Sequence, residues 1–150
     1  MTENGATRVG VYVCACGSNI AATVDITETV AFAATLPHVV VARSNEYLCS
    51  SVGQDMIKRD IRDLALERVV VAACSPRLHE PTFRSVLLAA GLNPYLLAMA
   101  NIREHSAWVA KDAAAGTAKA KRLISAAVHR VVWQEPLHER SAPVTPAALV

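Results

Sequence analysis

Several features of common protein classes are absent from this sequence. No stretch approaches the roughly 18 uninterrupted apolar residues of a membrane span, because Asp25, Glu28, Lys58 and Arg68 interrupt the most apolar regions. The opening residues, Met-Thr-Glu-Asn-Gly, lack the apolar core of a signal peptide, so we expect a cytoplasmic protein. The net charge of +2 is small and evenly spread, which argues against a nucleic-acid partner.

The motifs of common active sites are missing as well. We find no Ser-His-Asp set, no phosphate-binding loop and no paired carboxylates, so we do not expect this chain to be catalytic alone. It has no Gly-x-Gly-x-x-Gly turn, no Cys-x-x-Cys pair and no ferredoxin-type cysteine run. Its four cysteines are Cys14, Cys16, Cys49 and Cys74. In a reducing compartment, such cysteines indicate metal or redox chemistry more than structural disulfides.

Apolar runs alternate with helical patterns along the chain. Valine-rich or otherwise apolar runs predict four strands, at residues 9–13, 39–41, 69–73 and 95–99. Helices are expected after Asp25 with Glu28 completing a capping box, from Ser51, after Ser75-Pro76, and over residues 113–132. This alternation predicts an α/β fold, a small four-stranded parallel sheet with helices on both faces in Rossmann- or flavodoxin-like layers. The order of the strands does not follow from the pattern.

The domain organisation is simple. Residues 1–137 are predicted to form one α/β domain that carries all the cysteines, and 150 residues are enough to bury a core without disulfides. Residues 138–150 contain two prolines and are predicted to be a linker or tail.

Trp108 and Trp133 are expected to anchor helices against the sheet rather than to relay electrons.

The cysteines follow the predicted strands in phase. Cys14 and Cys16 come after the first strand, Cys49 lies between the second strand and its helix, and Cys74 ends the third. The carboxyl ends of parallel strands meet at one edge of a sheet, where neighbouring strands lie about 4.8 Å apart. We therefore expect the four thiols to share one site at that edge, with several of them before helix N-termini that favour thiolate.

Four thiolates can hold either one Zn²⁺ ion or an iron–sulfur cluster. A zinc ion about 2.3 Å from each sulfur needs closely packed ligands, whereas a larger cluster tolerates ligands from separate strands, so the geometry favours iron–sulfur. Two alternatives stay open: an assembly or binding module with structural zinc or an empty thiol site, and a thiol–disulfide oxidoreductase that uses Cys14 and Cys16. Buried cysteines can also be simple core residues.

Four basic residues are expected at the same edge of the sheet. In a purely structural interpretation, they are loop residues that form ion pairs with Glu80 and Glu104. In a functional interpretation, they donate hydrogen bonds or bring positive charge to an anionic cluster. These candidate cofactor-binding residues are Arg77, His79, Arg103 and His105.

Several uncommon motifs occur together and in order. They are Val-Cys-Ala-Cys-Gly-Ser-Asn-Ile at 13–20, Tyr-Leu-Cys-Ser at 47–50, Ala-Cys-Ser-Pro-Arg-Leu-His-Glu-Pro at 73–81, Gly-Leu-Asn-Pro-Tyr at 91–95 and Asn-Ile-Arg-Glu-His at 101–105. Together they resemble the N-terminal iron–sulfur domain of HdrA, the A-type component of heterodisulfide reductase. The resemblance implies an α/β module with a [4Fe-4S] cluster, and makes Cys14, Cys16, Cys49 and Cys74 the candidate metal ligands.

The resemblance also implies partners. HdrA-like proteins are flavoprotein components of cytoplasmic electron-transferring or electron-bifurcating complexes. Since this sequence contains no flavin-binding turn, we expect FAD only on a partner chain, a flavin-containing HdrA-like protein, together with other iron–sulfur subunits. One departure is local: the family usually continues Cys-Ser-Trp-Val-His after Arg-Glu-His, where this chain has Ser106-Ala-Trp-Val-Ala110.

Overall fold

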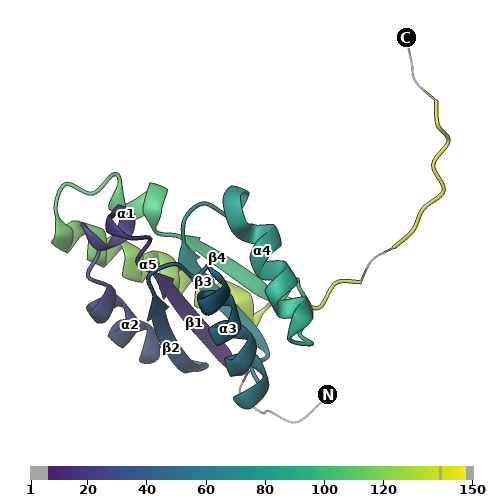
Figure 1. Ribbon diagram of the computed structural model, residues 1–150, viewed down its shortest axis with the longest axis horizontal. Helices are drawn as coiled ribbons and strands as arrows, with labels where there is room; N and C mark the ends of the chain where they lie inside the picture. Colours follow the sequence, from purple (N-terminus) through teal and green to yellow (C-terminus); the bar gives the residue numbers. More distant parts are fainter. Residues whose placement is uncertain (1–6, 139, 148–150) are drawn as a thin grey trace.

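The computed structural model describes residues 7–138 and 140–147, and within them four strands alternate with helices (Figure 1). The strands are β1 (Val9–Cys14), β2 (Val39–Asn45), β3 (Arg68–Ala73) and β4 (Leu97–Asn101). The helices are α1 (Ser18–Ala21), α2 (Ile26–Ala34), α3 (Ser51–Asp63), α4 (Pro76–Ala89), the π-helical turn η1 (Arg103–Ala107) and α5 (Ala113–Val132). The predicted α/β fold is confirmed.

The sheet is entirely parallel and its strand order is β2-β1-β3-β4. The two central strands are the most apolar, and every residue of β1 is buried. Tyr12 of β1 lies opposite Arg43 on one side and Val71 on the other. Strand β4 lies at one edge of the sheet, so its outer side has no neighbouring strand among the described residues.

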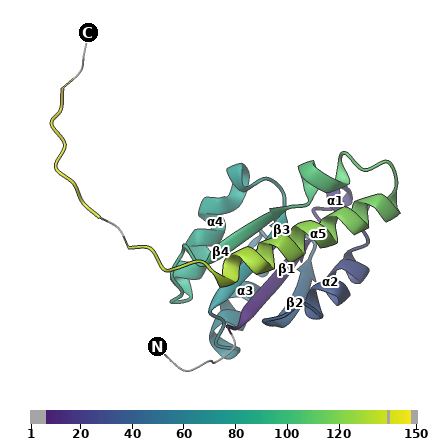
Figure 2. The same cartoon turned by 180° about the vertical axis from the view of Figure 1, so that it is seen from behind.

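Helices cover both faces of the sheet, as predicted. On one face, α2 packs on β1 and β2 while α5 packs on β3 and β4, and these two helices touch each other. On the other face, α3 and α4 lie side by side, which is clear when the two opposite views are compared (Figures 1 and 2). The core between these layers consists of the valines of β1 and β3 and of helix residues such as Phe83 and Ile124.

The predicted capping box of α2 is only half formed. Asp25 accepts a hydrogen bond from the backbone N–H of Glu28 at 2.8 Å, which is the expected N-cap. The Glu28 side chain, however, pairs with Lys121 of α5 instead of turning back to Asp25. The Asp25 N–H is satisfied by the hydroxyl of Thr117 at 2.9 Å. Contacts with α5 therefore replace the local bond.

Helix α3 begins at Ser51 as predicted, and its N-cap is Ser50, which accepts a hydrogen bond from the N–H of Gly53. Two other local expectations were wrong. Strand β4 starts at Leu97 instead of residue 95, because the preceding residues form a turn stabilised by the Asn93 side chain. Neither tryptophan anchors a helix: Trp108 is 57% exposed and Trp133 is 85% exposed.

A glycine inside α5 is explained by close packing. Gly116 lies in the first turns of the helix, where alanine has the higher helix propensity. A Cβ at this position would lie 2.1 Å from the carbonyl oxygen of Thr23. The adjacent carbonyl oxygen of Gly116 accepts a hydrogen bond from Ser106 at 2.8 Å. Gly116 thus lets α5 approach the loop after α1 and the η1 turn.

A buried polar group links β1, β2 and α3. Asp60, only 3% exposed, accepts a hydrogen bond from the Tyr12 hydroxyl at 3.2 Å and forms an ion pair with Arg43 at 2.7 Å. Burial, followed by the nearby Asp60 charge, raises the pKa of Tyr12 above its ordinary value. The hydroxyl therefore stays protonated and serves as a donor.

The chain leaves the domain beside β4. The side chain of Asn93 donates to the carbonyl oxygen of Leu137 at 2.9 Å, and residues 140–147 form no helix or strand (Figure 1). The boundary at residue 137 stays a prediction, and residues 1–6, 139 and 148–150 of the two predicted segments lie outside the described residues. In the described part of the chain, no helix is both long enough and apolar enough to cross a membrane.

Candidate metal centre at the carboxyl edge of the sheet

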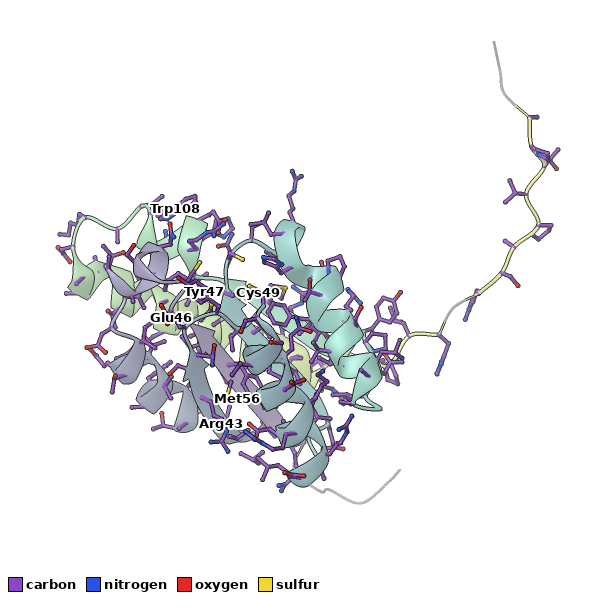
Figure 3. All side chains as sticks on the ribbon, in the orientation of Figure 1. Arg43, Glu46, Tyr47, Cys49, Met56 and Trp108 are labelled. Atoms are coloured by element: carbon purple, nitrogen blue, oxygen red, sulfur yellow. The ribbon has the colours of Figure 1, made fainter. Side chains whose placement is uncertain are left out.

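The four cysteines line one small cavity at the carboxyl edge of the sheet. The cavity has a volume of about 40 Å³, and all four thiols are free. Its other lining residues are Tyr47, Leu48, Ala73, His79, Phe83 and Arg103. Cys49 and Tyr47 lie next to each other at this edge in Figure 3. The structure therefore brings together thiols that are 60 residues apart in the sequence, from Cys14 to Cys74.

The Cys-Ala-Cys segment is held by backbone hydrogen bonds beyond the end of β1. Ala15 donates to the carbonyl oxygen of Asn45 at 3.0 Å, and Cys16 donates to that of Glu46 at 2.8 Å. Cys16 and Gly17 then adopt left-handed conformations, with φ of 49° and 54°. This reversal keeps both sulfurs at the cavity. A Cβ on Gly17 would lie 2.8 Å from the hydroxyl of the half-exposed Tyr47 side chain, which could shift, so it is the positive φ that favours glycine here.

The other two cysteines each precede a helix. Cys49 comes two residues before α3, and its carbonyl oxygen accepts from the Gln54 side chain at 2.8 Å. Cys74 comes two residues before α4, whose N-cap is Ser75. The positive end of a helix dipole stabilises a nearby thiolate. Both cysteines thus lie beside the positive end of a helix dipole.

Arg103 is the cation nearest the sulfurs among the lining residues. Its Nη1 donates to the sulfur of Cys16 at 3.6 Å, and its Nε and Nη2 donate to Glu104 at 3.2 and 2.8 Å. The guanidinium also lies 4.8 Å from the centre of the Trp108 ring. Burial alone would raise the pKa of Glu104, but the hydrogen bonds from Arg103 lower it below its ordinary value, so the pair is charged.

Two of the thiols are desolvated by burial. Burial raises the pKa of Cys14, and its proximity to Cys16 and Cys49 adds to the effect. Burial also raises the pKa of Cys74, although the charge of Arg103 opposes it. The Cys14 thiol donates to the carbonyl oxygen of Glu46 at 3.5 Å. This environment argues against Cys14 as the low-pKa nucleophile that a thiol–disulfide oxidoreductase needs.

The predicted basic residues divide into two groups. His79 and Arg103 line the cysteine cavity. Arg77 is exposed and does not line it, while His105 lines a separate cavity beside β4. Of the expected ion pairs, that of Arg103 with Glu104 forms, whereas Glu80 pairs with Arg84.

Tyr47 and Trp108 are site residues that the sequence analysis missed. Tyr47 covers Gly17, and Trp108 stacks on Arg103. The nearness of Tyr47 to Cys49 in the sequence was an available signal for the first. No sequence pattern indicated the second, since the η1 turn that places Trp108 beside Arg103 was not predicted.

The donor set fits an iron–sulfur cluster better than a single ion. Four sulfurs bound to one Zn²⁺ at about 2.3 Å would lie roughly 3.8 Å from one another. Within the part of the chain that the structure describes, no three side chains of Cys, His, Asp or Glu converge as such a site requires. A cluster takes one thiolate on each iron, so its ligands stand further apart. The four thiols that line the shared cavity provide the number of ligands that such a cluster needs.

The fold and the site together define an α/β domain with a four-thiol centre at its carboxyl edge. No protein-family model matches the chain. Over 144 residues, 95% of its length, it is 56% identical to an A-type iron-sulfur component of the CoB--CoM heterodisulfide reductase of Methanopyrus kandleri. Over 95% of its length it is also 51% identical to the A-type component of the H(2):CoB-CoM heterodisulfide,ferredoxin reductase of Methanothermobacter marburgensis. Over the same 95% it is 48% identical to an HdrA-like protein of Archaeoglobus profundus.

These matches confirm the resemblance that the motifs indicated: the chain matches a segment of HdrA proteins, the A-type components of heterodisulfide reductases. It spans only 20 to 22% of the length of these three relatives.

Proposed function

We propose that this chain is the electron-transfer iron–sulfur module of a heterodisulfide-reductase-like complex. The observation that carries the proposal is the convergence of Cys14, Cys16, Cys49 and Cys74 on one cavity. The four thiolates would hold a [4Fe-4S] cluster. The iron–sulfur name of a relative that is 56% identical supports this assignment.

A bound cluster supplies one-electron redox chemistry, and the chain's own residues control it. Arg103 brings a fixed positive charge and a hydrogen-bond donor to the sulfur of Cys16. Positive charge and hydrogen bonds at thiolate sulfur favour the more reduced state and raise the potential. Leu48 and Phe83, both almost fully buried, exclude water from the inner side of the cavity.

The partners follow from the same assignment. The chain would exchange electrons with a flavin-containing HdrA-like protein and with other iron–sulfur subunits, in the cytoplasm. Two of the relatives are named for heterodisulfide reductase activity, and one name also includes ferredoxin. The flavin chemistry would belong to a partner chain, and this module would not be catalytic alone.

Anaerobic reduction tests the proposal. The chain is reconstituted with iron and sulfide, and its broad absorption near 400 nm is followed during titration with dithionite. We expect bleaching by about one electron per cluster, with a paramagnetic signal from the reduced form. A chain that takes up zinc but no iron, or one whose colour does not respond to reductant, would contradict the assignment and favour an assembly module.

A further inference from the structure

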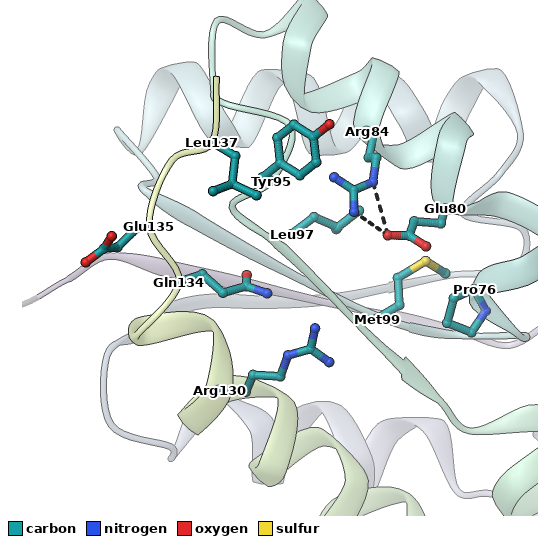
Figure 4. A pocket seen from close by; sticks show the side chains of 10 residues that line it. All are labelled: Pro76, Glu80, Arg84, Tyr95, Leu97, Met99, Arg130, Gln134, Glu135 and Leu137. Carbon is teal, nitrogen blue, oxygen red and sulfur yellow. Dashed lines mark hydrogen bonds and ion pairs between the residues drawn. The ribbon is translucent and has the colours of Figure 1, made fainter. Parts of the chain in front are cut away.

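A second candidate site lies away from the cysteines, along the free side of β4. Two cavities of about 430 and 280 Å³ adjoin there and share Pro76, Met99 and Arg130. Together they form what we call the β4 groove, which is lined by residues of α4 and α5. Figure 4 shows the larger of the two cavities. The larger cavity is also lined by Glu80, Arg84, Tyr95, Leu97, Gln134, Glu135 and Leu137.

The floor of the β4 groove contains open backbone hydrogen-bonding groups. Val69 donates to Leu96 at 3.1 Å and Ile102 donates to Ala73 at 2.9 Å, so the even-numbered residues of this strand face β3. In a parallel strand, the N–H and C=O groups of one residue point to the same side of the strand, and those of the next residue point to the opposite side. Leu97 and Met99 therefore present these groups to the groove, where no described backbone group bonds to them.

Two polar side chains in the walls of the groove have no partner in the part of the chain that the structure describes. Arg130 forms no ion pair with any described residue, whereas Arg84 is held by Glu80 and stacks on Tyr95 at 4.4 Å. The side-chain oxygen of Gln134 is buried and accepts no hydrogen bond within the described part. Among the described residues, the groove thus offers a cation without an ion pair, an acceptor without a donor, and apolar contacts next to open strand backbone.

We propose that the β4 groove binds an extended segment of a partner protein, which adds to the sheet as a fifth strand beside β4. Backbone groups of the segment would pair with those of Leu97 and Met99, which is the geometry of strand addition. An Asp or Glu side chain of the segment would pair with Arg130. This site is independent of the cysteine centre and of what that centre binds.

Other occupants fit the groove less well. A second copy paired about a twofold axis at the middle of β4 would bring Arg130 close to its own symmetry mate, which is repulsive. Residues 140–147 of this chain extend away from β4 (Figure 1). That stretch contains no carboxylate side chain, and two of its residues, Pro143 and Pro146, lack a backbone N–H.

The probe is a short synthetic peptide of alternating Val and Thr with a central Glu, compared with the same peptide carrying Lys. Amide hydrogen exchange is measured by NMR on the complete chain. We expect the Glu peptide to slow exchange at Leu97 and Met99 by about tenfold or more, since these amides become hydrogen bonded. The Lys peptide should protect them less. No protection by either peptide would overturn the proposal.

Two variants test the backbone and the charge separately. Met99→Pro removes an outward N–H and leaves the bonds to β3 intact, so it should abolish protection at Leu97, while Met99→Leu should retain it. Arg130→Glu should reverse the preference between the two peptides. Arg122→Glu makes the same change of charge at an exposed position of α5, and it should not reverse the preference between the peptides. Thermal unfolding of each variant shows whether it is folded.

The remaining outcomes identify other occupants. Protection of Leu97 and Met99 in the free chain that grows with protein concentration would assign the edge to a second copy. Protection in the free chain that is lost on removal of residues 138–150 would assign it to the tail. Either result would overturn the proposal. So would an Arg130→Glu variant that prefers the Glu peptide over the Lys peptide as much as the parent chain does.

Discussion

The guanidinium of Arg103 lies 3.6 Å from the sulfur of Cys16 and is held there from two other sides. Glu104 accepts two of its hydrogen bonds, and the ring of Trp108 lies under it. A charged donor fixed in this way needs little reorganisation when the charge of the sulfur site changes. This contact links the geometry of the site to its expected redox properties.

Replacing Arg103 should lower the reduction potential of the bound cluster. Arg103→Gln removes a positive charge beside Cys16, so the more negative reduced state loses stabilisation. We expect a decrease of roughly 60 mV, which corresponds to a tenfold change in a one-electron equilibrium. The measurement is a redox titration monitored by electron paramagnetic resonance.

Arg77→Gln is the matched control, because it removes the same charge from an exposed residue at this edge that does not line the cavity. Its potential should stay close to that of the parent chain. Equal shifts in the two variants would show that the contact with Cys16 has no special influence.

The metal-free domain should lose stability in alkaline solution. Burial raises the folded-state pKa of Cys14 and Cys74, while unfolded thiols titrate near a pKa of about 8.5. The folded state therefore binds more protons above that pH. The contribution of these two thiols to the free energy of unfolding is therefore fully present below about pH 8.5, and it is lost as the pH rises towards their folded-state pKa values.

Urea unfolding of the reduced, metal-free chain between neutral and alkaline pH measures this effect. In the double variant Cys14→Ala, Cys74→Ala the fall should be shallower, because the two titrating groups are gone. A stability that rises with pH in this range would show that these thiols are not desolvated as the structure indicates.

The sequence was sufficient for the parts of this fold and site that depend on local pattern. The valine run of β3 and the alanine-rich helix α5 were predicted at almost their observed bounds. The phase of Cys14, Cys49 and Cys74 with the strand ends placed them at one edge, and they line one cavity.

What could not be predicted depends on contacts between distant segments. The strand order results from packing of whole layers, and the stacking of Trp108 on Arg103 depends on the irregular η1 turn. His105 lies beyond the same strand end as Arg103, yet it lines the β4 groove because that turn directs the two side chains to different sides.

Gly116→Ala should destabilise the domain although alanine favours helix. The new Cβ would lie 2.1 Å from the carbonyl oxygen of Thr23, so α5 or the loop must move. We expect a net loss of about 2 kcal/mol in the free energy of unfolding, measured with urea. The exposed position Ala118 is the control, where Ala118→Gly should cost about 1 kcal/mol. A stabilised Gly116→Ala variant would contradict the observed approach of the two segments.

The buried Asp60 should contribute more to stability than the hydroxyl that it binds. Tyr12→Phe removes one hydrogen bond and leaves Asp60 paired with Arg43, so we expect a loss of about 1 kcal/mol. Asp60→Ala leaves the Tyr12 hydroxyl and Arg43 without their partner, with an expected loss of about 3 kcal/mol. Chemical unfolding of both variants and of the double variant measures their coupling. Additive losses would mean that Tyr12 and Asp60 do not interact.

Native mass spectrometry of the anaerobically reconstituted chain tests the central claim most directly, because it counts the metal and sulfide bound to each molecule. The account predicts a species with about four irons and four sulfides, and loss of that species when Cys74 or Cys49 is replaced by serine. Ser50→Ala, next to Cys49 but without a thiol, should retain it. A chain that carries a single zinc ion, or a full cluster that persists in all four single cysteine variants, would contradict the claim.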